Sequence, residues 1–208
     1  MGYTNRLPAI LLSLGYFLLL EGDYERGAAL NEETVAICQE HGYKAFLNYA
    51  LDNLGWAALL QRDHERVRTY YEESLLVCRE LGDKMIASES LDGLACISGA
   101  NGKDERAGRL FGATQALRVR EAVAFQLTPQ EDAWREPYRA ATRSLLGEAA
   151  WEEALEQGRA MGPEQVIEYA LSEEKPSATP PSYTTGQPSL SSSPPSTRAG
   201  SHLERWRC

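Results

Sequence analysis

The sequence has few of the residues on which metal and redox chemistry depend. Among its 208 residues are four cysteines and three histidines. The cysteines form no Cys-x-x-Cys pair, and the histidines are too scattered to share one metal ion. We therefore predict neither a metal nor a cofactor. We interpret the cysteines as small buried apolar residues of a protein in a reducing compartment, the cytoplasm.

Long hydrophobic runs are also missing. The longest apolar stretch is Leu7–Leu20, which is shorter than the ~20 apolar residues that a membrane-spanning helix needs. No small-residue cleavage pattern of a signal peptide follows it, because the next residues are Glu21, Gly22 and Asp23. We predict no membrane association.

Positive charge is scarce in most of the chain. The net charge is −9, and residues 1–174 alone carry 29 acidic and 17 basic side chains, a net charge of −12. A nucleic-acid-binding surface needs a positive patch that displaces the counterions of the phosphates. The composition therefore predicts no direct binding of nucleic acid.

None of the catalytic motifs that we sought is complete. The segment Gly99–Asp104 is similar to a phosphate-binding loop, but Ile97 stands where the first glycine is required and an aspartate replaces the magnesium-binding hydroxyl residue. His64 begins a zinc-protease pattern, yet Arg68 occupies the place of its second histidine. No serine lies in a Gly-x-Ser-x-Gly turn. We predict that the chain is not an enzyme.

An internal repeat organises the first part of the chain. Three segments align at one constant spacing: Leu11–Arg26 (LLSLGYFLLLEGDYER), Leu51–Arg66 (LDNLGWAALLQRDHER) and Leu91–Arg106 (LDGLACISGANGKDER). Each begins with leucine, has Leu-Gly or Leu-Ala after three residues, and ends with Glu-Arg. The distance from Leu11 to Leu51, and again to Leu91, is the repeat period. A period of this length indicates a repeated supersecondary unit.

Each unit predicts two helices, because apolar residues recur at three- and four-residue steps. Asp23 and Asp63 are good N-caps for the second helices, since a carboxylate accepts the free N–H groups of the first turn. Gly42 and Gly82 suit the left-handed position that follows a helix end. The third unit has Lys103 at the capping position, so we expect it to be the last.

These features resemble the tetratricopeptide repeat. In that family Leu-Gly marks the first helix, as at Leu54-Gly55, and an aromatic residue marks the second, as at Tyr71 and Phe111; the first unit has Asn31 there. The period here is longer than that of the typical repeat, about 34 residues, and it resembles the repeats of bacterial signalling ATPases. The resemblance implies an all-α, tetratricopeptide-type helical solenoid of about three helix pairs over residues 1–122.

The segment Arg109–Leu171 extends the resemblance. It is similar to the C-terminal region of bacterial regulators that combine a STAND ATPase module, a tetratricopeptide array and often a LuxR-type DNA-binding domain. The matching pieces are Arg109-Leu110-Phe111-Gly112-Ala113, Leu146-Gly147-Glu148, Gly158-Arg159 and Tyr169-Ala170-Leu171. These pieces carry no catalytic motif.

Residues 123–174 predict C-terminal capping helices. A capping box at Thr128–Glu131 starts the first, and Pro137 should kink or break it. Two shorter helices are expected at Glu148–Arg159 and Pro163–Ser172.

The composition changes in residues 175–208. Six prolines, eight serines and four threonines make up more than half of this segment, and such a segment cannot build a core. We predict a disordered tail. Its end, Leu203–Cys208, is either a short linear motif or a terminus without selected structure.

The functional surface of a helical solenoid is the concave face that its first helices line. The repeat register places six residues on this face: Tyr49, Asp52, Asn53, Trp56, Glu89 and Asp92. Three of them are acidic and no base accompanies them, which favours a protein or peptide partner that presents a basic or apolar segment. The two aromatic residues are either recognition anchors or packing residues between neighbouring repeats.

Two functions stay open at this point. The first is a protein–protein interaction module, the sensor or scaffold end of a STAND-type signalling ATPase or transcriptional regulator. The second is a freestanding cytoplasmic tetratricopeptide adaptor in signal transduction. The apolar stretch Leu7–Leu20 also predicts self-association or packing on a preceding repeat, because the end of a solenoid needs a polar outer face.

Overall fold

The computed structural model describes residues 6–120 and 129–172. In these two ranges all regular structure is α-helix, and the helices number nine. They are α1 (Arg6–Glu21), α2 (Tyr24–His41), α3 (Lys44–Leu60), α4 (His64–Leu81), α5 (Lys84–Ala100), α6 (Asp104–Arg120), α7 (Pro129–Leu146), α8 (Glu148–Arg159) and α9 (Pro163–Leu171). The all-α prediction is confirmed there, whereas the predicted tail lies outside the described residues.

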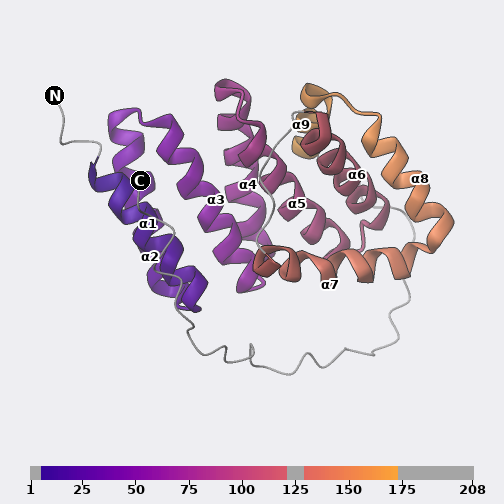
Figure 1. Cartoon of the computed structure of the whole chain (residues 1–208), viewed down its shortest axis with the longest axis horizontal. Coiled ribbons are helices and arrows are strands. Elements are labelled where there is room, and N and C mark those ends of the chain that lie inside the picture. Colours follow the sequence, from indigo (N-terminus) through magenta and orange to yellow (C-terminus); the bar gives the residue numbers. More distant parts are fainter. Residues whose placement is uncertain (1–5, 121–128, 173–208) are drawn as a thin grey trace. The chain divides into compact units, whose positions relative to one another are not determined.

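The repeat period is visible in the helix boundaries. Helices α3 and α5 begin and end one period apart, and so do α2 and α4. Each of the first six helices packs against the next, and the first helices of successive units, α1, α3 and α5, also contact one another (Figure 1). The three units are therefore helix pairs that repeat one packing pattern.

The predicted capping residues are found at both ends of the second helices α2 and α4. The side chains of Asp23 and Asp63 accept the N–H of the residue three positions on, at 3.3 and 3.2 Å. Gly42 and Gly82 take the left-handed conformation, with φ of 71° and 70°. Asp83, which the sequence analysis did not assign, caps α5 in the same way, at 3.0 Å from the N–H of Ile86.

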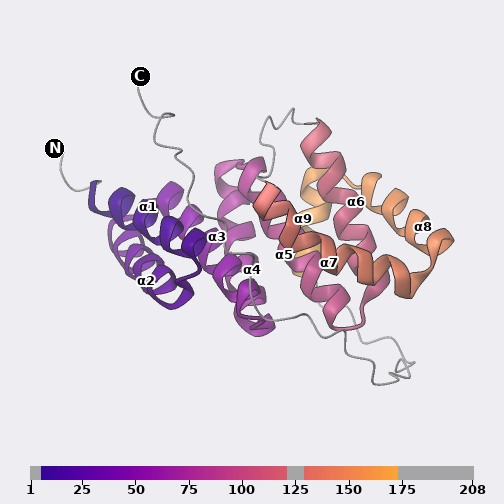
Figure 2. The same ribbon diagram turned by 60° about the horizontal axis from the view of Figure 1, so that its bottom comes forward.

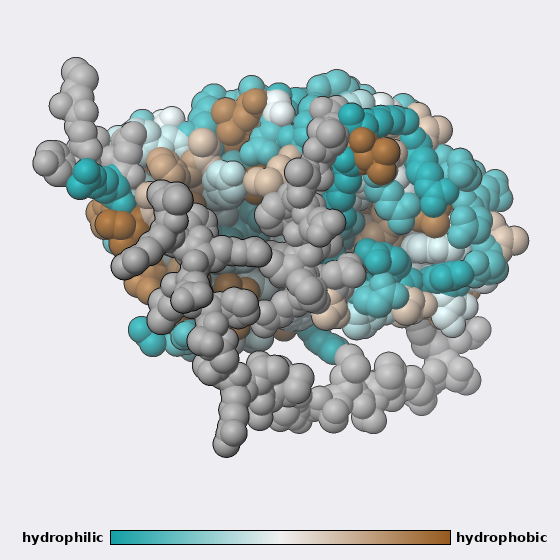
Figure 3. All heavy atoms as spheres, in the orientation of Figure 1, coloured by the Kyte–Doolittle hydropathy of each residue, from teal (hydrophilic) through white to brown (hydrophobic). Residues whose placement is uncertain are grey.

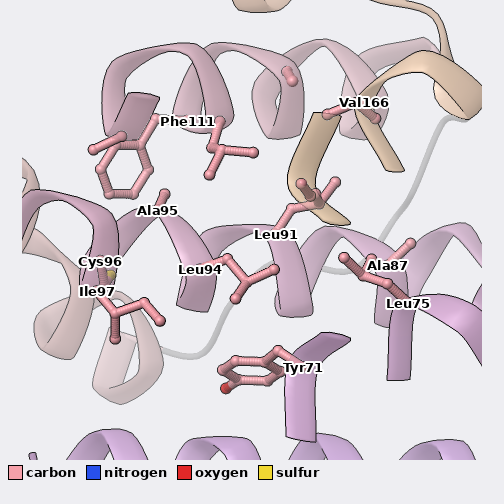
Figure 4. Close-up of a cluster of buried hydrophobic side chains, with 14 of the residues drawn as sticks. Tyr71, Leu75, Ala87, Leu91, Leu94, Ala95, Cys96, Ile97, Phe111 and Val166 are labelled. Atoms are coloured by element: carbon pink, nitrogen blue, oxygen red, sulfur yellow. The ribbon is translucent and has the colours of Figure 1, made fainter. Parts of the chain in front are cut away.

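The ring of Tyr71 packs between two first helices. It extends from α4 and is buried among core side chains of α5 such as Leu94 (Figure 4). A Cβ atom built on Gly55 of α3 would come within 2.5 Å of the ring, and one on Gly93 of α5 would come closer still. Glycine is therefore required on both sides of the ring, which explains the Leu-Gly feature of the second unit.

In the first unit a polar side chain takes the place of the Tyr71 ring between the helices. Asn31 of α2 occupies the position of Tyr71 in the repeat and is fully buried. Its amide donates to the carbonyl of Gly27 at 2.8 Å, and its oxygen accepts from the amide of Asn53 at 3.0 Å. Because the buried amide is hydrogen-bonded, it is tolerated between the helices.

Three further helices cover the C-terminal end of the repeats. Helix α7 lies across α5, while α8 packs against α6 and α9 contacts α4 and α6 (Figures 1 and 2). Gly112 and Gly158 bring α6 and α8 together so closely that a Cβ on either glycine would overlap the main chain of the opposite helix. The end of the repeat array is thus closed by main-chain contact.

The expectations for these helices were largely correct. Helix α8 has the predicted bounds, and α9 ends at Leu171, one residue before the predicted end. Of the kink or break expected at Pro137, the break is wrong, because α7 continues through this residue. Residues on both sides of the proline are held in the core, Arg135 and Thr142 being buried.

Leucines at equivalent repeat positions provide a test of this packing. Leu54 of α3 is buried, whereas Leu14 of α1 is half-exposed. We expect Leu54→Ala to lower the free energy of unfolding by ~2–5 kcal/mol, as for other buried leucines. Leu14→Ala should cost less than ~1 kcal/mol, as a surface change does. Urea denaturation of both variants measures the difference, and equal losses would contradict the difference in burial between the two leucines.

Candidate functional site: a groove lined by the first helices

The first helices of all three units line one open groove with a volume of about 300 Å³. Each helix contributes three residues: Leu12, Ser13 and Tyr16 from α1, Tyr49, Asp52 and Asn53 from α3, and Met85, Ile86 and Glu89 from α5. Four of the six residues that the sequence placed on this face are among them. Trp56 and Asp92 lie elsewhere.

Tyr49 is the most accessible aromatic residue that the sequence analysis selected. Its side chain is 39% exposed on the groove wall. Burial raises the pKa of its phenol, and the carboxylates of Asp83 and Asp52 raise it further. The hydroxyl group therefore stays neutral at physiological pH and can donate or accept a hydrogen bond.

Trp56 packs between neighbouring repeats. It is only 8% exposed, and its ring lies 5.9 Å from the ring of Tyr16, centroid to centroid, with the planes inclined by 38°. Its buried Nε1 has no hydrogen-bond partner among the described residues. Of the two interpretations of Trp56, the structure supports packing, and the idea of an exposed anchor is wrong for this residue.

Tyr16 is the groove residue that the sequence analysis could have found. It precedes Trp56 by one repeat period, just as Leu12 and Ser13 precede Asp52 and Asn53. The search was confined to the second and third units. Applying the same register to the first unit would have placed all three on the groove.

A cluster of four charged side chains lies at the α5 side of the groove and includes the lining residue Glu89. Glu89 and Asp92 of α5 each pair with Arg118 of α6, at 2.9 and 2.8 Å. Arg135 of α7 pairs with Glu89 and lies 3.6 Å from Asp92. Both acids and Arg135 are buried. The cluster holds two positive and two negative charges, so it is balanced.

This cluster corrects the electrostatic prediction. The face was expected to be acidic and to carry no base, but Arg118 and Arg135 neutralise Glu89 and Asp92. Burial works to lower the pKa of Arg135, yet the two carboxylates outweigh it and the pKa is raised. The arginine therefore stays charged.

Nucleophilic and metal chemistry find no support in the described residues. Cys38, Cys78 and Cys96 are buried, as predicted, while Cys208 lies outside the described ranges. Burial raises the pKa of the Cys78 and Cys96 thiols to about 12, so neither forms the reactive thiolate. Within the described ranges no group of three or more histidine, cysteine or acidic side chains is placed to hold a metal ion.

A larger cleft between α6, α7 and α8 is less suited to a ligand. Its volume is about 630 Å³, but its charged groups pair with one another. Arg139 pairs with Glu136 at 2.9 Å, and Arg143 pairs with Glu148.

Among the helices that the structure describes, none is both long enough and apolar enough to cross a membrane.

The buried cluster can be tested with two arginines of the same helix. Arg135→Met removes one of the two arginines that pair with the buried Glu89 and Asp92, so we expect a loss of ~3–5 kcal/mol in the free energy of unfolding. Arg143 forms an exposed pair with Glu148, and Arg143→Met should leave the unfolding transition unchanged within error. Chemical denaturation compares the two. An Arg135→Met variant as stable as Arg143→Met would contradict the role given to the cluster.

Comparisons of the chain with protein-family models, with curated proteins and with solved structures found no match. The groove and the residues that line it are therefore the basis for a proposal about function.

Proposed function

We propose that the chain is a protein–protein interaction module that binds a peptide segment of its partner in the groove between α1, α3 and α5. The observation that supports this most is that three successive units each contribute three side chains to one continuous open surface. Repeated helix pairs are suited to such extended binding surfaces. The segment is expected to contact all three units.

The chemistry of the groove favours an apolar segment. Leu12, Met85 and Ile86 supply apolar surface, and Tyr16 and Tyr49 supply rings with polar tips. Large aromatic side chains with a polar end are common at the centre of protein interfaces. Within the described part of the chain, the residues that line the groove include no lysine or arginine, so the groove does not suit a phosphate or a free carboxylate.

Charge makes a smaller contribution than the sequence suggested. Arg118 and Arg135 offset the charge of Glu89, and exposed ion pairs contribute little each. We infer a mainly apolar segment.

We further propose, from the sequence resemblance, that the module is the sensor or scaffold end of a STAND-type signalling ATPase or transcriptional regulator in the cytoplasm. In that setting the partner segment belongs to another domain of the regulator or to a protein that controls it. A neighbouring coding sequence with a complete phosphate-binding loop favours this assignment. Its absence favours a freestanding adaptor.

Selection from a random library of short peptides tests the groove directly. Peptides retained by the purified chain should carry several large apolar residues. We expect Tyr49→Ala to weaken the selected peptides about tenfold or more, the loss typical of an interface anchor. Surface plasmon resonance measures the change in affinity.

Leu76→Ala is the control for these measurements. Leu76 is an exposed apolar residue of α4 and does not line the groove, so its variant should bind like the wild type. Peptides whose affinity is unaffected by Tyr49→Ala would show that the groove is not the binding site.

The interaction role also predicts that nucleotides do not bind. The segment Gly99–Asp104, which is similar to a phosphate-binding loop in sequence, covers the end of α5 and the start of α6. The residue before it, Ser98, donates its hydroxyl to the carbonyl of Leu94 at 2.7 Å. We expect no heat of binding when ATP or GTP with magnesium is titrated into the chain in a calorimeter, and no release of phosphate. Saturable binding or turnover would revive an enzymatic function.

A further inference from the structure

The outer face of α1 carries an apolar stripe. Its four large side chains are about half exposed or more, and they recur at three- and four-residue steps, as Leu7, Ile10, Leu14 and Phe17. Hydrophobic surface gathers at the α1 end of the chain in Figure 3. This spacing is that of the a and d positions of a coiled-coil helix, which pack against a partner helix.

The repeat shows what this face does in the other units. Leu14 is 49% exposed, whereas its counterparts Leu54 and Leu94 are 1% and 4% exposed. Helix α2 packs against α3, and α4 packs against α5. Ser90, the counterpart of Ile10, accordingly donates to a serine hydroxyl of α4 at 3.0 Å. The stripe is therefore the face by which a first helix packs on another helix.

The stripe is bulkier than the same face of α3. Where α1 has Ile10 and Phe17, α3 has Ala50 and Ala57, both buried, whereas α5 has Ser90 and Ile97. A stripe of large side chains at the a and d positions fits the interlocking of side chains with a helix that carries a similar stripe.

The opposite end of the array offers no place for α1 of a second copy. The last second helix, α6, is covered by α8, and Gly112 and Gly158 leave no space between the two main chains. Head-to-tail stacking of copies is thereby blocked among the described helices. Pairing of the stripe with the same stripe of a second copy stays open, and it gives a closed two-fold dimer.

We propose that α1 packs antiparallel against α1 of a second copy of this chain. The charged residues of α1 are Arg6 and Glu21, at its two ends, so an antiparallel pair keeps like charges apart, whereas a parallel pair would place them side by side. The two helix dipoles are also opposed. A two-fold axis near Leu12 places Ile10 opposite the partner's Leu14. The groove lies on another face of α1, so dimerisation and peptide binding use separate surfaces.

Sedimentation equilibrium of the full chain tests the dimer. Four side chains of this size supply less than the ~800 Å² per partner of a standard interface, so we expect a monomer–dimer equilibrium over roughly 1–300 µM. Leu14→Glu should weaken dimerisation at least tenfold. Leu76→Glu, which alters a leucine of similar exposure on α4, should not. A wild-type monomer at all concentrations, or a Leu14→Glu dimer as strong as the wild type, would overturn the proposal.

Disulfide trapping tests the direction of the helices with substitutions that preserve folding. In a Cys208→Ser background, Ile10→Cys and Leu14→Cys chains are oxidised separately and as a mixture. The antiparallel pair predicts that the mixture forms covalent dimers faster than either chain alone. Faster trapping within each single variant indicates a parallel pair, and absence of trapping indicates no α1 contact; both results overturn the proposal.

Discussion

The spacing of the first helices depends on what the second helices insert between them. The ring of Tyr71 fits only because Gly55 and Gly93 have no side chain on either side of it. This contact sets how far α5 lies from α3, and the hydrogen-bonded pair Asn31–Asn53 does the same for α1 and α3. The groove runs along these three helices, so its width follows from one buried ring and one buried amide pair.

The two ends of the repeat array are finished in different ways. At the C-terminal end, Arg135 brings α7 onto α5 through the buried charges of Glu89 and Asp92, and α8 closes over α6. Buried ion pairs lose much of their attraction to desolvation, so the cluster specifies the position of α7 more than it adds stability. It also neutralises part of the groove. At the α1 end an apolar helix face stays exposed.

The sequence predicted best those features that depend on neighbouring residues. The caps Asp23 and Gly42 and the bounds of α8 follow from local patterns, and the repeat period identifies equivalent helices. Sequence-based prediction failed for side chains whose contact partner lies far along the chain. Arg135 contacts Glu89 across 46 positions from a helix outside the repeat, so no register could have placed it there. The sequence left both interpretations of Trp56 open, because its neighbour, Tyr16, belongs to a different unit.

The most direct test of the groove uses the methionine methyl groups. The chain has three methionines, of which Met85 lines the groove and Met161 lies between α8 and α9. With ¹³C-labelled methyl groups, a peptide selected by the chain should shift the NMR signal of Met85 and leave that of Met161 in place. A shifted Met161 signal with an unchanged Met85 signal would contradict the claim that the first helices form the binding surface.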